Sequence, residues 1–285
     1  MKTCNPNTVS TLLNYTNLLA AEIYTFTPAS GNQLLYTSLD TSITIQGNTF
    51  ESGGLLIKRG SIKQALGVTV DQLELTVYPT TANIAGVPFL AALRNGALDG
   101  AMVLLQRMFF KWWAMDGLID TITMFNGYVS DIDPIGRTSA TLKISSVADF
   151  LSVQWPRMVY AAQCVWRLYD AGCGVNRNSF TYSGSVTGNA TVNGFSTSLN
   201  NANDYFDQGA VIFTSGQNIY ALRTVQLFSA GNVSIAYPLL NAPANNDTFN
   251  IYAGCDHQYQ TCVSKFSNGN NFRGFPFIPA PESAY

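Results

Sequence analysis

The sequence predicts a mainly β protein with little helix, built from antiparallel strands. From residue 22 onward, short apolar and aromatic runs are separated by Gly, Asn, Asp and Pro, as is typical of strands joined by turns. Many of these runs alternate apolar and polar residues or are rich in β-branched residues, which favours strands over helices. Helical spacing is limited to a few short stretches.

The first part of the chain carries the longest strand patterns. A short helix is predicted near Thr8, and its apolar residues are Leu12, Leu13, Leu18 and Leu19. Residues 88–101 are expected to form a turn of helix or a loop, and residues 146–151 a second short helix. Strand patterns occupy residues 22–28, 41–50, 73–79, 101–110, 120–132 and 139–146.

A smaller β module is predicted at residues 179–250, where the runs become rich in Ser, Thr and Gly. Hairpin turns are expected at residues 187–189, 193–194, 215–218 and 230–232. The module looks inserted, because a pair of cysteines lies on each side of it. The predicted organisation is therefore a β region at 1–155, a cysteine-bearing region at 156–178 and 251–285, and the inserted module between these two segments.

The charge content excludes two classes of partner. Charged residues make up 11% of the 285 residues, and the formal net charge is −2. The local basic cluster at residues 58–63 is too small to bind nucleic acid specifically. The apolar stretch at 100–115 is interrupted by Gln106, Arg107 and Lys111, so we expect no membrane span.

The N-terminal residues do not match a secretion signal. The apolar stretch within residues 1–22 is broken by Asn14, Thr16 and Asn17. We therefore expect the chain to stay in the cytoplasm where it is made, a reducing compartment that disfavours structural disulfides.

Four cysteines form two local pairs. Eight residues separate Cys164 from Cys173, and six separate Cys255 from Cys262. If the inserted module begins and ends at one point, the four thiols meet there. Two disulfides, a tetrahedral zinc and a Cys₄ iron–sulfur cluster all remain open, although the spacings match neither zinc knuckles nor ferredoxins.

Two further candidates for metal chemistry are given structural interpretations. His257 lies between two of the cysteines, and we interpret it as a half-exposed loop histidine. Cys4 stands apart from both pairs and is interpreted as a free thiol or a small apolar residue.

Catalysis has weak support in this sequence. His257 is the single histidine, and it lies beside candidate metal ligands, where it would be a poor base. Two carboxylate pairs, Asp131 with Asp133 and Asp204 with Asp207, lie near turns, where aspartates usually bond locally. The aromatic residues Phe109, Phe110, Trp112 and Trp113 are interpreted as a buried seam. We therefore expect a protein that is not an enzyme.

Three segments carry a resemblance to a known family: residues 164–176 ("CVWRLYDAGCGVN"), 254–266 ("GCDHQYQTCVSKF") and 271–279 ("NFRGFPFIP"). Together they resemble phage tail-tip hub proteins, the group that includes tail-tip protein L of lambda-like phages and gene-transfer-agent hubs. Residues 21–77 are similar to the same group in their strand rhythm. The resemblance therefore covers nearly the whole chain.

The resemblance implies a virion protein that caps the tail tube as a homotrimer. Its β region is expected to form tube-like or barrel-like hub domains. Its partners are then a distal tail protein, the tape measure protein and central fibre proteins, and the genome DNA only passes through the channel. The resemblance also implies a [4Fe-4S] cluster held by Cys164, Cys173, Cys255 and Cys262, with zinc as the alternative.

Two expectations concern surfaces. The C-terminal segment carries Phe272, Phe275, Phe277 and Ile278 interleaved with prolines. These side chains either cover the cluster in their own subunit or dock on a neighbouring subunit or the next tail protein. The alternative function is a tail component that binds a receptor or a polysaccharide through the module at 179–250.

Overall fold

The computed structural model describes residues 6–14, 18–29, 31–63, 70–111, 118–152 and 161–277, and it is mainly β with short helices. The chain divides into two compact units, Met1–Val153 and Gln154–Tyr285. Cys4, Trp112, Trp113 and Ile278 lie outside the described residues. Within the described ranges, no helix is long and apolar enough to cross a membrane.

The first unit is built on one antiparallel sheet of seven strands in the order β2-β1-β9-β10-β11-β6-β5. These strands are β1 (Leu19–Thr27), β2 (Leu34–Thr37), β5 (Leu55–Arg59), β6 (Gln72–Pro79), β9 (Met102–Phe110), β10 (Leu118–Ile135) and β11 (Ala140–Ser145). The other elements are α1 (Pro6–Asn14), the hairpins β3 (Ile43–Ile45) with β4 (Asn48–Phe50) and β7 (Asn83–Ile84) with β8 (Val87–Pro88), α2 (Phe89–Arg94) and the 3₁₀ helix η1 (Val147–Leu151).

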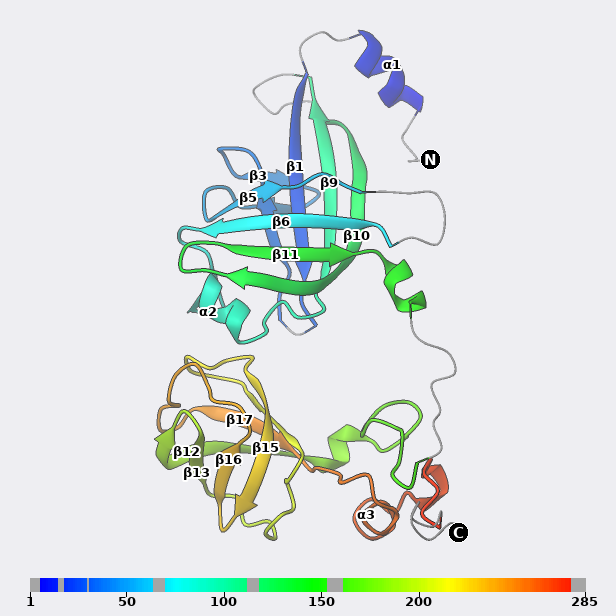
Figure 1. Cartoon of the computed structure of the whole chain (residues 1–285). Coiled ribbons are helices and arrows are strands. Elements are labelled where there is room, and N and C mark those ends of the chain that lie inside the picture. The colour runs from blue at the N-terminus through cyan, green and yellow to red at the C-terminus, as the bar shows by residue number, and fades with distance from the viewer. Residues whose placement is uncertain are drawn as a thin grey trace. The chain divides into compact units, whose positions relative to one another are not determined.

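The sheet curls strongly, so that β6 and β11 run across β1 and β9 (Figure 1). Strand β10 makes the bend, because it pairs with β9 along its first part and with β11 along its second part. Its register shifts at Thr123/Phe125 and at Val129/Asp131, and such bulges bend a strand and increase its twist.

Alternating burial explains the inner face of this sheet. Leu73, Leu75 and Val77 of β6 are buried, and the residues between them are more exposed. Strand β1 is buried on both faces, since Ile23 and Tyr24 are both buried. The second face of β1 packs under the β3–β4 hairpin in a separate small core, which contains Ala21, Ile23, Ile43, Phe50, Met108 and Phe110.

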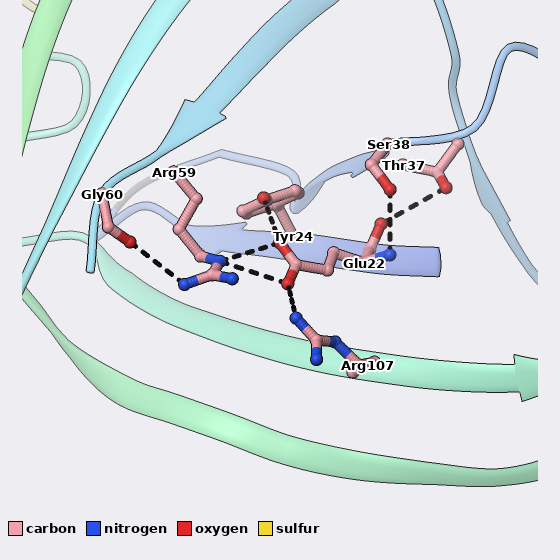
Figure 2. A network of polar contacts seen from close by, with 7 residues as sticks. All are labelled: Glu22, Tyr24, Thr37, Ser38, Arg59, Gly60 and Arg107. Atoms are coloured by element: carbon pink, nitrogen blue, oxygen red, sulfur yellow. Dashed lines mark hydrogen bonds and ion pairs between the residues drawn. The ribbon is translucent and has the colours of Figure 1, made fainter. Parts of the chain in front are cut away.

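One carboxylate on β1 is bonded to β5, the last strand at the other end of the curled sheet (Figure 2). Glu22 of β1 lies directly opposite Arg107 of β9 and binds it at 2.6 Å. Arg59 of β5, from the far end of the strand order, donates from Nε to both carboxylate oxygens at 2.9 and 3.1 Å. The Tyr24 hydroxyl donates a further bond at 2.9 Å. Side chains therefore link strands that no backbone ladder joins.

The environment of Glu22 favours its ionised form. Burial opposes ionisation, but the hydrogen bonds from Arg59, Arg107 and Tyr24 outweigh it and hold the pKa of this carboxyl below its ordinary value. Burial and the adjacent Glu22 charge raise the pKa of Tyr24, so its hydroxyl remains a donor.

The second unit contains a closed antiparallel barrel in the order β12-β13-β16-β15-β14-β17. The strands are β12 (Thr181–Thr191), β13 (Gly194–Thr197), β14 (Ala210–Phe213), β15 (Leu222–Ser229), β16 (Asn232–Ile235) and β17 (Thr248–Tyr252). The 3₁₀ helix η2 (Arg177–Phe180) precedes the barrel, and α3 (Tyr259–Ser264) and the 3₁₀ helix η3 (Gly269–Asn271) follow it. Its core is dominated by Phe195, Phe206, Phe213, Phe228 and Phe249.

Most of the predicted elements are confirmed, and two details are wrong. The six predicted strand segments all form strands, and residues 146–151 contain η1. The predicted N-terminal helix ends at Asn14, and Leu19 instead begins β1 opposite Phe110. Residues 187–189 form no turn, because they lie inside β12 at a register shift around Gly188.

Replacing Glu22 by Gln should destabilise the first unit. The substitution leaves Arg59 and Arg107 without their counter-charge, and we expect a loss of about 2 kcal/mol, since partly exposed arginines are screened by solvent. Because the folded pKa of Glu22 is lowered, its stabilisation is complete above the unfolded pKa and disappears as the pH falls through the folded value. Urea unfolding should show that the free energies of unfolding of wild type and E22Q differ less in acid than at pH 7.

The matched control is Asp131→Asn, whose bond to Lys143 at 2.8 Å joins two exposed side chains. This variant should unfold like the wild type. The role assigned to Glu22 would be contradicted if D131N and E22Q lost similar amounts of stability. It would also be contradicted if the difference in stability between wild type and E22Q increased in acid.

Candidate metal centre and comparison with known proteins

Closure of the barrel brings two distant chain segments together. Strands β12 and β17, the first and the last of the barrel, are paired, with Thr181 opposite Tyr252. The contact continues beyond the strands, where Ala253 N donates to Phe180 O at 3.2 Å. The chain therefore enters and leaves the barrel at one place, with Cys164 and Cys173 on one side of the barrel in the sequence and Cys255 and Cys262 on the other.

The four cysteines line one cavity. Its apolar walls come from Trp166, Leu168, Val175, Phe266 and Phe272. All four cysteines are free thiols, with Cys173 and Cys262 buried and the other two partly buried. The structure therefore contains no disulfide among them.

Three of the four sulfurs each accept a hydrogen bond from one N–H group. The backbone N–H of His257 donates to Cys255 Sγ at 3.4 Å, and that of Arg273 donates to Cys164 Sγ at 3.5 Å. The side-chain amide of Asn268 lies 3.8 Å from Cys173 Sγ. The fourth thiol, Cys262, donates to the Asn268 carbonyl at 3.3 Å. N–H groups aimed at sulfur stabilise thiolates, which is the form that binds metal.

The two cysteine segments are joined by direct bonds. Cys164 N donates to His257 O at 2.9 Å, and His257 Nδ1 lies 3.0 Å from Cys164 O. A carbonyl oxygen only accepts, so the second bond requires the proton on Nδ1. His257 is partly buried in a loop, and its role in this geometry is to hold the two segments in register.

Local turns orient the cavity cysteines. Asp170 accepts from Cys173 N at 2.6 Å and from Arg167 N at 3.2 Å. The Trp166 ring packs on Gly172, where a Cβ would lie 2.6 Å from ring atoms. Asn268 also donates to Cys173 O at 2.6 Å. These contacts fix the segment between the first two cysteines from both of its ends.

As isolated thiols, Cys255 and Cys262 resist ionisation. Burial raises the pKa of Cys262 to about 11, and the neighbouring cysteines add to the effect. Burial likewise raises the pKa of Cys255, although the N–H of His257 acts in the opposite direction.

The donor set fits a sulfur-ligated metal group. Four thiols from two segments, apolar walls and N–H groups directed at sulfur are the features of such sites. Among the described residues, no three His, Cys, Asp or Glu side chains lie close enough together to hold a single metal ion. The thiols therefore line the cavity without converging on one point.

A tight backbone crossing supports the centre. At Gly254 an added Cβ would lie 1.8 Å from Asp207 O and 2.3 Å from Gly209 N. Lys265 Nζ binds Gly254 O at 2.8 Å and also donates to Tyr205 O, which ties α3 to the barrel. Burial lowers the pKa of Lys265, and this effect outweighs the nearby charges of Cys255, Asp207 and Asp256, which act to raise it.

The carboxylate pairs and the aromatic tail have the following positions. Asp131 binds Lys143, and Asp207 accepts from Phe228 N at 2.7 Å. Phe272 lines the cysteine cavity and meets the Tyr259 ring edge to face, whereas Phe277 is 90% exposed. The tail therefore covers the centre with its first aromatic residue and leaves a later one free.

The comparisons with known proteins agree with this architecture. The family described as baseplate hub protein, N-terminal attachment domain, matches residues 6–176, which is more than half of the chain. The chain belongs to this baseplate hub family. A second family, described as phage conserved hypothetical protein BR0599, matches residues 204–282. No curated protein matches the chain.

A solved structure has the same fold. One chain in the virion of a native gene transfer agent particle superposes with a TM-score of 0.78 at 23% identity, over 98% of this chain and 96% of that chain. The resemblance to tail hub proteins is thus confirmed, and the chain is a structural component of the phage tail or baseplate type. The first cysteine pair falls within the baseplate hub match and the second within the BR0599 match.

The sequence did not identify several residues of the centre. The cavity cysteines or their backbone are contacted by Asn268, by Asp170 and by the backbone N–H of Arg273. An Asn in a loop and an Asp in a turn are common everywhere, so their types carried no specific pattern. Asp170 lies within the quoted motif "CVWRLYDAGCGVN", which was the available indication of its importance.

Replacing Gly254 by Ala should destabilise the second unit by at least about 3 kcal/mol, because the new methyl group meets backbone atoms that cannot move aside. Denaturant unfolding measures the loss, and thiol labelling under native conditions should show faster modification of the cavity cysteines. Gly188→Ala is the matched control, since no atom lies within 4 Å of the added Cβ. Equal stabilities of the two variants would contradict the tight crossing.

Proposed function

We propose that this chain is the tail-tip hub of a phage-like particle: a trimer that caps the tail tube, links it to distal tail proteins and holds a structural [4Fe-4S] cluster. The observation that carries the proposal is that four free thiols, from segments on either side of a closed barrel, line one cavity. Membership of the baseplate hub family supports the location in a tail.

The residues that would hold the cluster are Cys164, Cys173, Cys255 and Cys262. When bound, the cluster supplies four iron–sulfur bonds that cross-link the two chain segments. The chain's own part is to direct N–H groups at the sulfurs and to exclude water with Trp166 and Phe272. Its role is mechanical, because the bonds it adds lock the entry and exit of the barrel together.

The trimer and its partners are supported by the exposed surface. Charged residues are scarce in the chain, and Val147, Phe150 and Leu151 are exposed together on η1. Apolar groups of this kind suit contact with another subunit. In the assembled tail the hub contacts a distal tail protein, the tape measure protein and central fibre proteins. It assembles in the host cytoplasm, and DNA only passes through its channel.

Iron analysis tests the cluster. Protein purified without oxygen should be brown and contain about four iron and four sulfide per chain. Serine at any one of the four cavity cysteines should lower the iron content and the visible absorption. Cys4→Ser is the matched control and should keep both. Colourless protein with one zinc per chain would contradict the cluster and favour zinc.

Light scattering tests the trimer, which should have three times the 30.9 kDa mass of the chain. Leu151 is 77% exposed, so the substitution Leu151→Glu should leave the chain folded. It should abolish the trimer, because the new charge would be buried between subunits. Asp149→Asn on the same 3₁₀ helix should remain trimeric. A stable monomer in the wild type, or a trimer unaffected by L151E, would contradict this arrangement.

The alternative function, receptor or polysaccharide binding by the barrel, is favoured by Tyr237, which is 71% exposed. Exposed aromatic rings are common contacts in binding surfaces. A particle that carries the substitution Tyr237→Ala distinguishes the binding function from the hub function. Complete tails that fail to adsorb would support the alternative, whereas the hub function requires that loss of the chain leaves tails unassembled.

A further inference from the structure

A second cavity lies beside the cysteine cavity in the same unit. Its volume is about 510 Å³, and it shares Leu168, Cys255 and His257 with the cysteine cavity. Its other walls come from the segment before the barrel and from barrel residues such as Gln208 and Thr224. The other three cysteines that are proposed to hold the cluster do not line this space.

Two arginines, Arg167 and Arg177, line this second cavity, and their guanidinium N–H groups have no acceptor among the described residues. Arg177 stacks on the ring of Tyr252, with its guanidinium carbon 3.8 Å from the ring centroid. Stacking uses the face of the guanidinium and leaves its N–H groups free at the edge. In the part of the chain that the structure describes, neither Arg167 nor Arg177 forms an ion pair, and neither guanidinium has a hydrogen bond.

The positive charge of the cavity is balanced only in part, because two arginines and one carboxylate line it. Asp170 is the carboxylate among its lining residues, and its two oxygens accept from Cys173 N and Arg167 N. Tyr169 donates its hydroxyl to Ala253 O at 2.8 Å. Burial raises the pKa of Tyr169, so it adds no negative charge. The two arginines that line this concave space therefore exceed its single carboxylate by one charge, and that carboxylate is already bonded to backbone N–H groups.

The geometry selects a class of ligand. A stacked guanidinium presents a planar pair of donors, which matches the two oxygens of a carboxylate. A nucleic acid backbone needs an extended basic track, and this chain has a net charge of −2 and few basic residues. The volume is too small for a folded domain but accommodates one or two side chains of an extended segment.

We propose that this cavity binds a carboxylate side chain on an acidic peptide segment of another protein chain, with Arg177 and Arg167 as the groups that grip it. Binding of the carboxylate by these arginines requires neither the cluster nor the trimer. Its failure in a binding experiment would leave iron content and assembly state as they are, so the two proposals can fail separately.

Ligand-observed NMR on the full chain tests the site. The probe is N-acetylglutamate N-methylamide, which has one carboxylate and no other charge. Its glutamine counterpart, N-acetylglutamine N-methylamide, is the uncharged control. We expect saturable binding of the glutamate probe only, and a loss of affinity of about tenfold or more in Arg177→Gln and in Arg167→Gln, as for one charge-assisted hydrogen bond. Arg177→Lys should also bind more weakly, because an ammonium lacks the planar fork.

The matched control variant is Arg137→Gln, an exposed arginine of the first unit, and it should bind the probe like the wild type. Denaturant unfolding confirms that each variant is folded, and Arg167→Gln keeps the test valid if loss of the Tyr252 stack unfolds Arg177→Gln. Equal binding of both probes, no saturable binding, or unchanged affinity in the cavity variants would overturn the proposal. Displacement by inorganic phosphate at a lower concentration than the probe itself would overturn the carboxylate assignment in favour of a phosphate site.

Discussion

The pairing of β12 with β17 is the constraint on which the second unit depends. These strands are the first and last of the barrel, so their ladder places Phe180 beside Ala253 and the two cysteine segments beside each other. The approach is close enough at Gly254 that no side chain fits there. The barrel therefore supplies most of the loop closure that four thiols on distant segments would otherwise have to provide. A metal group in this cavity adds bonds to an arrangement that the backbone ladder already favours.

The first unit closes its sheet in a different way. Strand β5 is at one end of the strand order and β2 at the other, and the Glu22 network joins β5 to β1 through side chains. A backbone ladder is insensitive to pH in the neutral and acid range, whereas this connection depends on one carboxylate staying ionised. An open edge also invites pairing with other chains, and Lys58, exposed on β5, is the kind of residue that discourages it.

Local patterns predicted the strands, and long-range contacts decided what the patterns missed. Alternation in residues 73–79 and 139–146 was enough to predict β6 and β11, because one face of each is buried. Leu19 had helical spacing with earlier leucines but pairs with Phe110, so a tertiary contact overrode local preference. The partners of Glu22 lie 37 and 85 residues away, and no local pattern announces them. The paired cysteines were visible from their spacing, while Asn268 was not, since nothing distinguishes it from other loop asparagines.

The two cavities of the second unit are linked by more than a shared wall. Arg167 lies between Cys164 and Cys173, and Arg177 follows Cys173 by four residues, so one short segment carries both the thiols and the guanidinium groups. Asp170 fixes both ends of that segment by accepting from Arg167 N and Cys173 N. Ligation of the thiols would restrict this segment further and lower the entropy that the arginines lose when they bind a partner. A structural metal group in such a place would contribute to recognition through rigidity.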